Sequence, residues 1–312
     1  MKNKIFFLSA FLFLFIAALA NDKTPPEKEV SAGKEAALAK IKNLEASLKY
    51  ERGEIKIKDG LATLKIPEGY RYLNPVDAEK VLVEGWGNPP SSKTLGMLFR
   101  SDVSPFSDNS WGVVITYQED GYVKDDEAAS INYTDLLKTM KESTVEENEE
   151  RIKAGYEKVE LVGWAEQPHY DKANHKLYWA QDLRFGDDPD HTLNYDVRVL
   201  GRRGVLSLNA IASTDQLQSI QVDMQSVMSF VEFNDGNRYT DFTPGVDKVA
   251  AFGIGALIAG KLAAKAGFFK LLIPTLLAAK KLILVGILAL GALIGKFFGW
   301  KKKTDDETNS IT

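Results

Sequence analysis

The fold is indicated most clearly by one part of the sequence: Thr192-Leu-Asn-Tyr-Asp-Val-Arg-Val-Leu200, followed by Gly201-Arg-Arg-Gly204 and by Val205-Leu-Ser-Leu-Asn-Ala-Ile-Ala212. Apolar and polar side chains alternate through both halves, which is the period of a β-strand. The four residues between the halves begin and end with glycine, which favours a tight turn. We therefore predict two antiparallel strands joined as a hairpin.

The alternation gives the predicted hairpin one apolar face and one polar face. In the first strand Leu193, Tyr195, Val197 and Val199 alternate with Asn194, Asp196 and Arg198. In the second strand Leu206 and Leu208 alternate with Ser207 and Asn209, and in a preceding strand at 175–185 Leu177, Trp179 and Leu183 alternate with Asp182 and Arg184. The polar face is either a recognition surface for a polar or charged ligand or a set of exposed cross-strand ion pairs.

Other segments extend this pattern toward both ends of the chain. Alternating residues around Asp59-Gly60 predict another hairpin, and Asn74-Pro75 predicts the start of a helix that ends near Glu84. Further strands are expected at 94–100, 111–118 and 157–164, and helices at 27–50, 133–153 and 213–231. Consecutive strands with short connections predict an α+β fold, in which helices cover an antiparallel sheet.

The first 20 residues have the three parts of a secretory signal peptide. Lys2 and Lys4 precede an apolar run, and Ala18-Leu19-Ala20 is a small-residue cleavage site before polar Asn21. An uncleaved N-terminal anchor is the alternative. A linker and an amphipathic helix are expected over 21–52, followed by a soluble domain over 53–246.

The C-terminal region has the composition of a membrane anchor. Residues 282–300 form an apolar run of bilayer length, and the lysines of the polar tail 301–312 follow as a stop-transfer cluster. Residues 247–281 are also apolar but carry lysines, so they form either an interfacial helix or the first span of a hairpin. Gly291-x-x-x-Gly295 would allow two anchors to associate.

The expected soluble domain is strongly acidic. The leader and the last 64 residues hold 11 of the 39 basic side chains but only three of the 43 acidic ones, which leaves residues 21–248 with a net charge of −12. Because such a surface repels phosphate backbones, nucleic acid is not expected as a partner. The chain has no cysteine, which excludes disulfides, thiol nucleophiles and cysteine-ligated metal sites.

Several motifs resemble the DUF2167 family of bacterial membrane-anchored proteins of unknown function. They are Gly85-Trp-Gly-Asn-Pro-Pro90, Gly163-Trp164, Pro168-His-Tyr-Asp171, His175-Lys-Leu-Tyr-Trp-Ala180, Leu193 to Leu206, Asp241-Phe242 and Asp247-Lys-Val-Ala-Ala-Phe-Gly253. The resemblance implies a signal peptide and a C-terminal anchor, and it supplies no catalytic residues. A weaker likeness to the Mog1/PsbP-like sandwich, carried by Ile66-Pro-Glu-Gly-Tyr70 and the helix before Phe230, implies a binding or assembly module at the level of fold alone.

Two functions remain open from the sequence. The first is a non-enzymatic binding or envelope-assembly module, anchored in the bacterial inner membrane and facing the periplasm, with an envelope protein as partner. The second is an envelope hydrolase with paired carboxylates such as Asp171 and Asp196. No catalytic residue or cofactor is predicted. A metal site is not predicted either, because His169 and His175 flank Asp171 at a poor spacing for metal ligands. The candidate ligand-binding residues are Asp171, Asn194, Asp196, Arg198, Arg202 and Arg203.

Arg198 is the candidate of greatest interest. Its guanidinium is always charged and offers five donors in a fixed fork, so it suits either a cross-strand carboxylate or an anionic ligand. Asp196, Asp182 and Asp171 are its expected partners within the domain.

Overall fold

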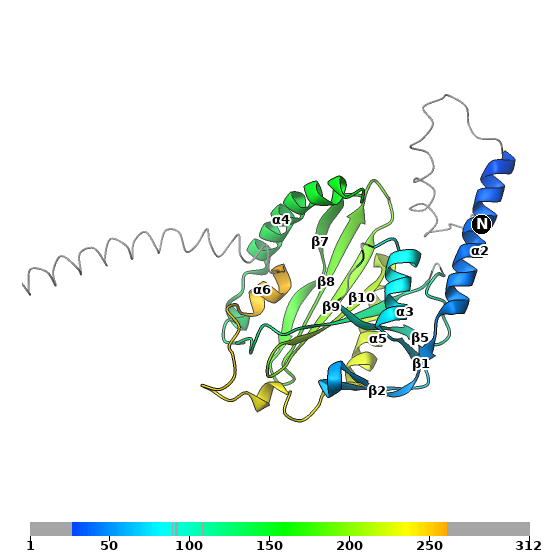
Figure 1. The fold of residues 1–312 in the computed structure, drawn as a ribbon. Coiled ribbons are helices and arrows are strands. Elements are labelled where there is room, and N and C mark those ends of the chain that lie inside the picture. The colour runs from blue at the N-terminus through cyan, green and yellow to red at the C-terminus, as the bar shows by residue number, and fades with distance from the viewer. Residues whose placement is uncertain (1–26, 89, 91–92, 108, 261–312) are drawn as a thin grey trace, which may run out of the picture. The chain divides into compact units, whose positions relative to one another are not determined.

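A computed structural model describes residues 27–88, 90, 93–107 and 109–260. The described chain has an α+β fold built around one large antiparallel sheet, which confirms the predicted fold class (Figure 1). The strands of this sheet are β1 (Tyr50–Glu51), β4 (Tyr70–Leu73), β5 (Thr94–Arg100), β6 (Gly112–Gln118), β7 (Val159–Asp171), β8 (Lys176–Phe185), β9 (Thr192–Leu200) and β10 (Val205–Ser213). Their order is β1-β4-β5-β6-β10-β9-β8-β7, so β9 and β10 lie near the middle.

A smaller sheet and several helices pack around the large one. The small sheet has the order β11-β3-β2, from β2 (Gly53–Ile57), β3 (Ala62–Ile66) and β11 (Val231–Phe233). The α-helices are α2 (Glu27–Ser47), α3 (Pro75–Lys80), α4 (Tyr133–Lys153), α5 (Leu217–Ser229) and α6 (Ile254–Ala259). Short helical turns are η2 (Lys58–Gly60), η3 (Val81–Gly85), η4 (Ala128–Ser130), η5 (Thr214–Gln216) and η6 (Tyr239–Asp241).

The hairpin of β9 and β10 forms as the sequence predicts. Its ladder runs without interruption from Val205 opposite Leu200 to Ser213 opposite Thr192. Gly204 closes the turn beside β6, where an added Cβ would collide with the carbonyl oxygen of Gln118. A glycine is therefore required at this position, because the neighbouring backbone leaves no room for a side chain.

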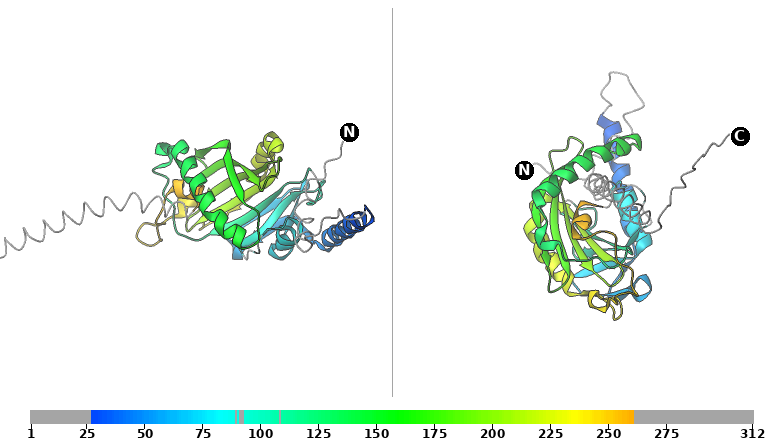
Figure 2. Two further views of the ribbon diagram at one scale, coloured as in Figure 1. Left: turned by 90° about the horizontal axis from the view of Figure 1, so that it is seen from above. Right: turned by 90° about the vertical axis from the view of Figure 1, so that its left-hand side faces the viewer.

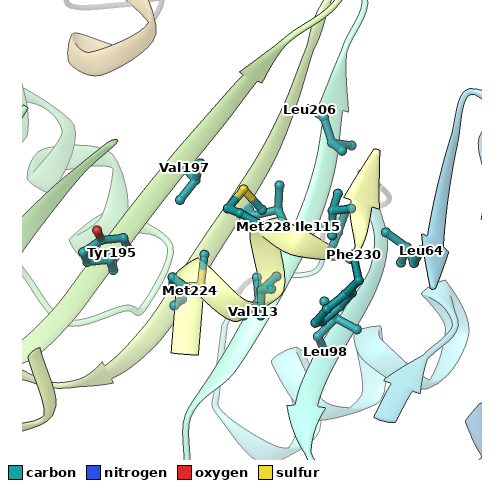
Figure 3. Packing of buried hydrophobic residues seen from close by; sticks show 14 of the residues in the cluster. Leu64, Leu98, Val113, Ile115, Tyr195, Val197, Leu206, Met224, Met228 and Phe230 are labelled. Carbon is teal, nitrogen blue, oxygen red and sulfur yellow. The ribbon is translucent and has the colours of Figure 1, made fainter. Parts of the chain in front are cut away.

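The first face of the large sheet carries the main apolar core. Leu193, Tyr195 and Val197 of β9 point into this core, where they meet α5 and the small sheet. Figure 3 shows Met224 and Met228 of α5 lying against sheet residues such as Val197. The apolar periodicity predicted for the hairpin and for the last helix is confirmed by this packing.

The second face carries two separate apolar clusters. The α4–α6 cluster lies at the β7–β8 end and includes Met140, Leu257 and Trp179. The α3 cluster lies at the β4–β5 end and includes Val81 and Phe99. Figure 2 shows α3 and α5 on opposite sides of the strands. The centre of the second face lies between the two clusters.

Residues beyond the predicted end of the soluble domain also pack in its core. The sequence predicts an end at residue 246, whereas α6 buries Ile254, Leu257 and Ile258 in the α4–α6 cluster. Residues 254–259, at the start of the apolar segment predicted over 247–281, thus pack against the domain.

Most of the predicted membrane and export segments lie outside the described residues. These are the leader at 1–20, the remainder of the apolar segment from 261, the predicted span at 282–300 and the tail at 301–312. Among the described helices, none combines the length and the apolar character needed to cross a bilayer.

Candidate ligand-binding site

Polar side chains occupy the centre of the second face, between the two apolar clusters. Arg198 of β9 lies opposite Ser207 of β10, which in turn lies opposite Thr116 of β6. Asp196 lies opposite Asn209 in the adjacent row. Directly opposed residues in an antiparallel ladder share a face, so these five side chains form one polar strip across three strands.

The structure corrects the predicted orientation of β8. Leu177 lies opposite Arg198 and Trp179 lies opposite Asp196, so both apolar residues are on the polar face. Asp182 lies opposite Leu193 on the first face, where its carboxylate is 2.8 Å from Nδ1 of His191. Asp182 is therefore not a partner of Arg198, and Trp179 is.

Arg198 is held on two sides. Its Nη1 is 2.8 Å from Oδ1 of Asp196, which makes the contact an ion pair. Its Cζ lies 5.0 Å from the ring centre of Trp179, which is a cation–π distance. The side chain remains 16% exposed. The guanidinium is thus fixed in place, on a side chain that is not fully buried.

Asp196 is a buried carboxyl group, with 5% of its surface exposed. Burial raises its pKa, while Arg198 and the hydrogen bond from Asn209 oppose that rise without cancelling it. The ion pair with Arg198 and the hydrogen bond from the side-chain amide of Asn209 offset part of the free-energy cost of burying this carboxylate. The Asp196–Arg198 pair is accordingly part of the fold as well as a candidate site.

Two further polar atoms at this place are buried without a partner among the described residues. They are Nε1 of Trp179 and Oγ of Ser207, on residues that are 1% and 3% exposed. Since nearly all buried polar groups in proteins are hydrogen-bonded, an unpartnered donor marks a place that a polar group or water can satisfy. The sequence alternation predicts Trp179 on the apolar face, and only the register, which puts it opposite Asp196, shows that it lies beside Arg198.

Arg202 and Arg203 lie in the β9–β10 turn, where they bind the chain that follows β11. Nε of Arg202 donates to Oδ2 of Asp247 at 2.7 Å, and Nη2 of Arg203 donates to Oδ1 of Asn237 at 2.8 Å. Arg202 holds the pKa of Asp247 below its usual range. Both arginines therefore hold the C-terminal part of the domain and do not join Arg198 in the strip.

Asp171 lies on the other face of the sheet from Asp196. It is opposite Lys176, which is opposite Val199, whereas Asp196 is an odd number of residues from Val199 along β9. Alternate residues of a strand point to opposite faces, so Asp171 and Asp196 do not form a carboxylate pair.

The two histidines that flank Asp171 in sequence also separate. The ring of His169 stacks on Tyr178 with centroids 4.9 Å apart, while His175 packs against Tyr239 at 4.2 Å. Asn194, Asp196 and Arg198 are the three predicted candidates that share one face.

A family model of proteins of unknown function, DUF2167, matches residues 49–291. The match spans more than half of the chain. The chain belongs to the DUF2167 family. The DUF2167 match includes every strand of the large sheet and the whole polar strip around Arg198.

Solved structures similar to this DUF2167 chain are distant. One is cyanobacterial PsbP (CyanoP) from Synechocystis sp. PCC 6803, at 12% identity and a TM-score of 0.32, covering 61% of this chain and 94% of that one. Another is the Ran-binding protein Mog1p of Saccharomyces cerevisiae, at 10% identity and a TM-score of 0.32, covering 63% and 100%. Likenesses at this score carry no conclusion about function. A search of curated proteins found no match.

Proposed function

We propose that this DUF2167 chain is an exported, membrane-anchored binding module of the bacterial envelope that holds an anionic group of its ligand at Arg198. The observation that carries the proposal is the side chain of Arg198, which is fixed between Asp196 and Trp179 and is 16% exposed. A cation that is already oriented by the protein loses little side-chain entropy when a ligand binds.

The surroundings of Arg198 favour an anion over other ligands. Trp179 Nε1 and Ser207 Oγ are additional donors on the same face, and neither has a partner among the described residues. Asp196 contacts the guanidinium of Arg198 at Nη1, and a guanidinium has five N–H donors in all. A carboxylate or phosphate group suits this set of donors, because charged acceptors form the stronger hydrogen bonds with arginine.

The location in the envelope is part of the proposal and rests on the sequence. The leader with Ala18-Leu19-Ala20 supports export, and the apolar run at 282–300 with Lys301 to Lys303 supports anchoring in the inner membrane. In that arrangement the domain faces the periplasm and an envelope component is the partner, while Gly291 and Gly295 allow anchors to associate. A hydrolase, as the alternative, would need a carboxylate pair other than Asp171 and Asp196.

Calorimetric titration of the full-length protein in a neutral detergent tests the binding site. Succinate and inorganic phosphate are the anionic probes, and succinamide is the uncharged control. We expect saturable binding of an anionic probe and at least about tenfold weaker binding by Arg198→Lys, which keeps the charge beside Asp196 but loses the planar fork. Arg184→Lys, on the exposed part of β8, is the matched control. Equal binding of succinamide, or no effect of Arg198→Lys, would refute the proposal.

A further inference from the structure

A pocket of about 590 Å³ lies on the first face of the large sheet, between α5 and the strands β7, β8 and β9. It is therefore on the opposite side of the sheet from Arg198. Strand β7 supplies Glu166, His169 and Asp171 to its wall. A volume of this size accommodates a small organic ligand.

Aromatic rings form part of the pocket wall. Tyr178 and Tyr195 line it, and the ring of His169 stacks on Tyr178 with only 7° between the planes. Burial raises the pKa of both tyrosines, so their hydroxyl groups stay protonated at neutral pH. The pocket thus offers neutral aromatic groups, whose ring faces attract cations.

Two carboxylates stand beside these rings. Oε2 of Glu166 accepts a hydrogen bond of 2.6 Å from Nε2 of Gln221 on α5. Asp171 accepts from the side chain of Asn174 at 2.6 Å and from the backbone N–H of Ala173 at 3.0 Å. These hydrogen bonds, that of the Asn174 side chain foremost, hold the pKa of Asp171 below its usual range, so the group is ionised at neutral pH.

The charged groups of the pocket wall are mainly carboxylates, and Nδ1 of His169 lies 3.4 Å from Oε1 of Glu166. None of the described residues that line it is lysine or arginine. Lys176 lies opposite Asp171 in the ladder, and its Nζ donates to the carbonyl oxygen of Met228 at 3.4 Å. Burial lowers the pKa of Lys176, while the charge of Asp171 opposes that shift. Within the described part of the chain there is also no group of three or more side chains suited to a metal ion. An organic cation fits this wall better than a metal does.

We propose that this pocket binds an alkylammonium group, through Glu166 and Asp171 and the ring faces of the tyrosines. Carboxylates supply the charge, and the aromatic rings cover the hydrocarbon next to the nitrogen. The ammonium group belongs either to a small free amine or to a lysine side chain of a peptide. The pocket and the Arg198 site share no residue. A failure to bind amines would therefore not contradict the proposed anion site, and a failure to bind anions would not contradict the pocket.

The test is calorimetric titration of the full-length protein in neutral detergent with 1,5-diaminopentane. The second probe is a lysine tripeptide with blocked ends, and 1,5-pentanediol is the uncharged control of similar shape. We expect at least one of the two amines to bind saturably, with an affinity that falls as salt is raised, and the tighter of the two identifies the source of the ammonium group. Binding of the diol as strong as that of the diamine, or no saturable binding of either amine, would overturn the proposal.

Variants of the wall provide a second, independent test. Glu166→Gln keeps the size of the side chain and should weaken amine binding at least about tenfold, because a charged partner is lost. Glu160→Gln is the matched control on the same strand, since Glu160 is exposed and pairs with Arg184. Gln225 is exposed on α5 and lines the pocket, so Gln225→Glu should tighten binding and Gln225→Lys should weaken it without loss of folding. The proposal fails if Gln225→Glu and Gln225→Lys bind the amine equally, or if Glu160→Gln weakens amine binding as much as Glu166→Gln does.

Discussion

Removing the guanidinium of Arg198 should destabilise the domain in a way that depends on pH. In Arg198→Ala the carboxyl group of Asp196 remains buried but loses its ion pair at 2.8 Å. It must then either stay ionised without a counter-charge or take up a proton when the domain folds. The cheaper of these two outcomes sets the loss of stability.

The expected loss follows from the two routes. An uncompensated buried charge costs about 3–5 kcal/mol. Protonating the carboxyl group instead costs about 4 kcal/mol at pH 7, because the pKa of an unfolded aspartate is about 3.9 and each pH unit is worth about 1.36 kcal/mol. At pH 5 the same protonation costs only about 1.5 kcal/mol. The variant should therefore lose about 3–4 kcal/mol at pH 7 and about 1.5 kcal/mol at pH 5.

The sign of this dependence follows from the raised pKa of Asp196 in the folded state. A group that binds its proton more tightly when folded contributes its full stability below its unfolded pKa and loses it as the pH rises through the folded pKa. Urea denaturation of residues 27–260, followed by circular dichroism at pH 5 and pH 7, measures the difference. Asp196→Asn combined with Arg198→Ala should abolish it, because no carboxyl group then remains to titrate. A loss that is equal at both pH values, or below about 1 kcal/mol at pH 7, would show that the Asp196–Arg198 pair does not stabilise the fold in this way.

Three further outcomes follow from the fold and the leader. A chain that ends after Gly245 lacks the three buried side chains of α6, worth roughly 1.5–3 kcal/mol each, so it should lose cooperative urea unfolding, whereas a chain that ends after Gly260 should keep it. Gly204→Ala should lower stability by about 1–3 kcal/mol because its Cβ meets the β6 backbone, whereas Gly163→Ala, which meets nothing within 4 Å, should leave the melting temperature nearly unchanged. Mass spectrometry of the mature protein should find Asn21 at its N-terminus, and a chain that retains Met1 would contradict cleavage of the leader.

The parts of the fold that could be predicted are those where sequence period and packing agree. Alternation in β9 and β10 identified the hairpin and assigned the two faces correctly, because both strands are long and lie near the middle of the sheet. Asn74 caps α3 as predicted, since its side chain accepts from the backbone N–H of Val76 and Asp77. Strands β4 and β11 were missed because they have only four and three residues, too few to show a period.

The candidate site was predicted in part, and the failures have one physical origin. The sequence period says which residues of a strand share a face, but not which face of the neighbouring strand they join, and a slip of one residue reverses the answer. For this reason the alternation alone predicts the wrong face for Trp179 and makes Asp182 an expected partner of Arg198. For the same reason the sequence suggests Asp171 and Asp196 as a carboxylate pair, although the ladder through β8 puts them on opposite faces of the sheet.

The indole N–H of Trp179 gives the most direct measurement of an anion at Arg198. In a ¹H–¹⁵N spectrum of residues 27–260 this signal can be assigned by its loss in Trp179→Phe. The indoles of Trp86 and Trp164 serve as internal references, because they donate to the carbonyl oxygens of Pro105 and Tyr133. On titration with phosphate or succinate, the Trp179 signal should move saturably while the two references stay in place, and succinamide should have no effect. A Trp179 signal that does not move with either anion, or that moves equally with succinamide, would contradict the binding of an anionic group at this site.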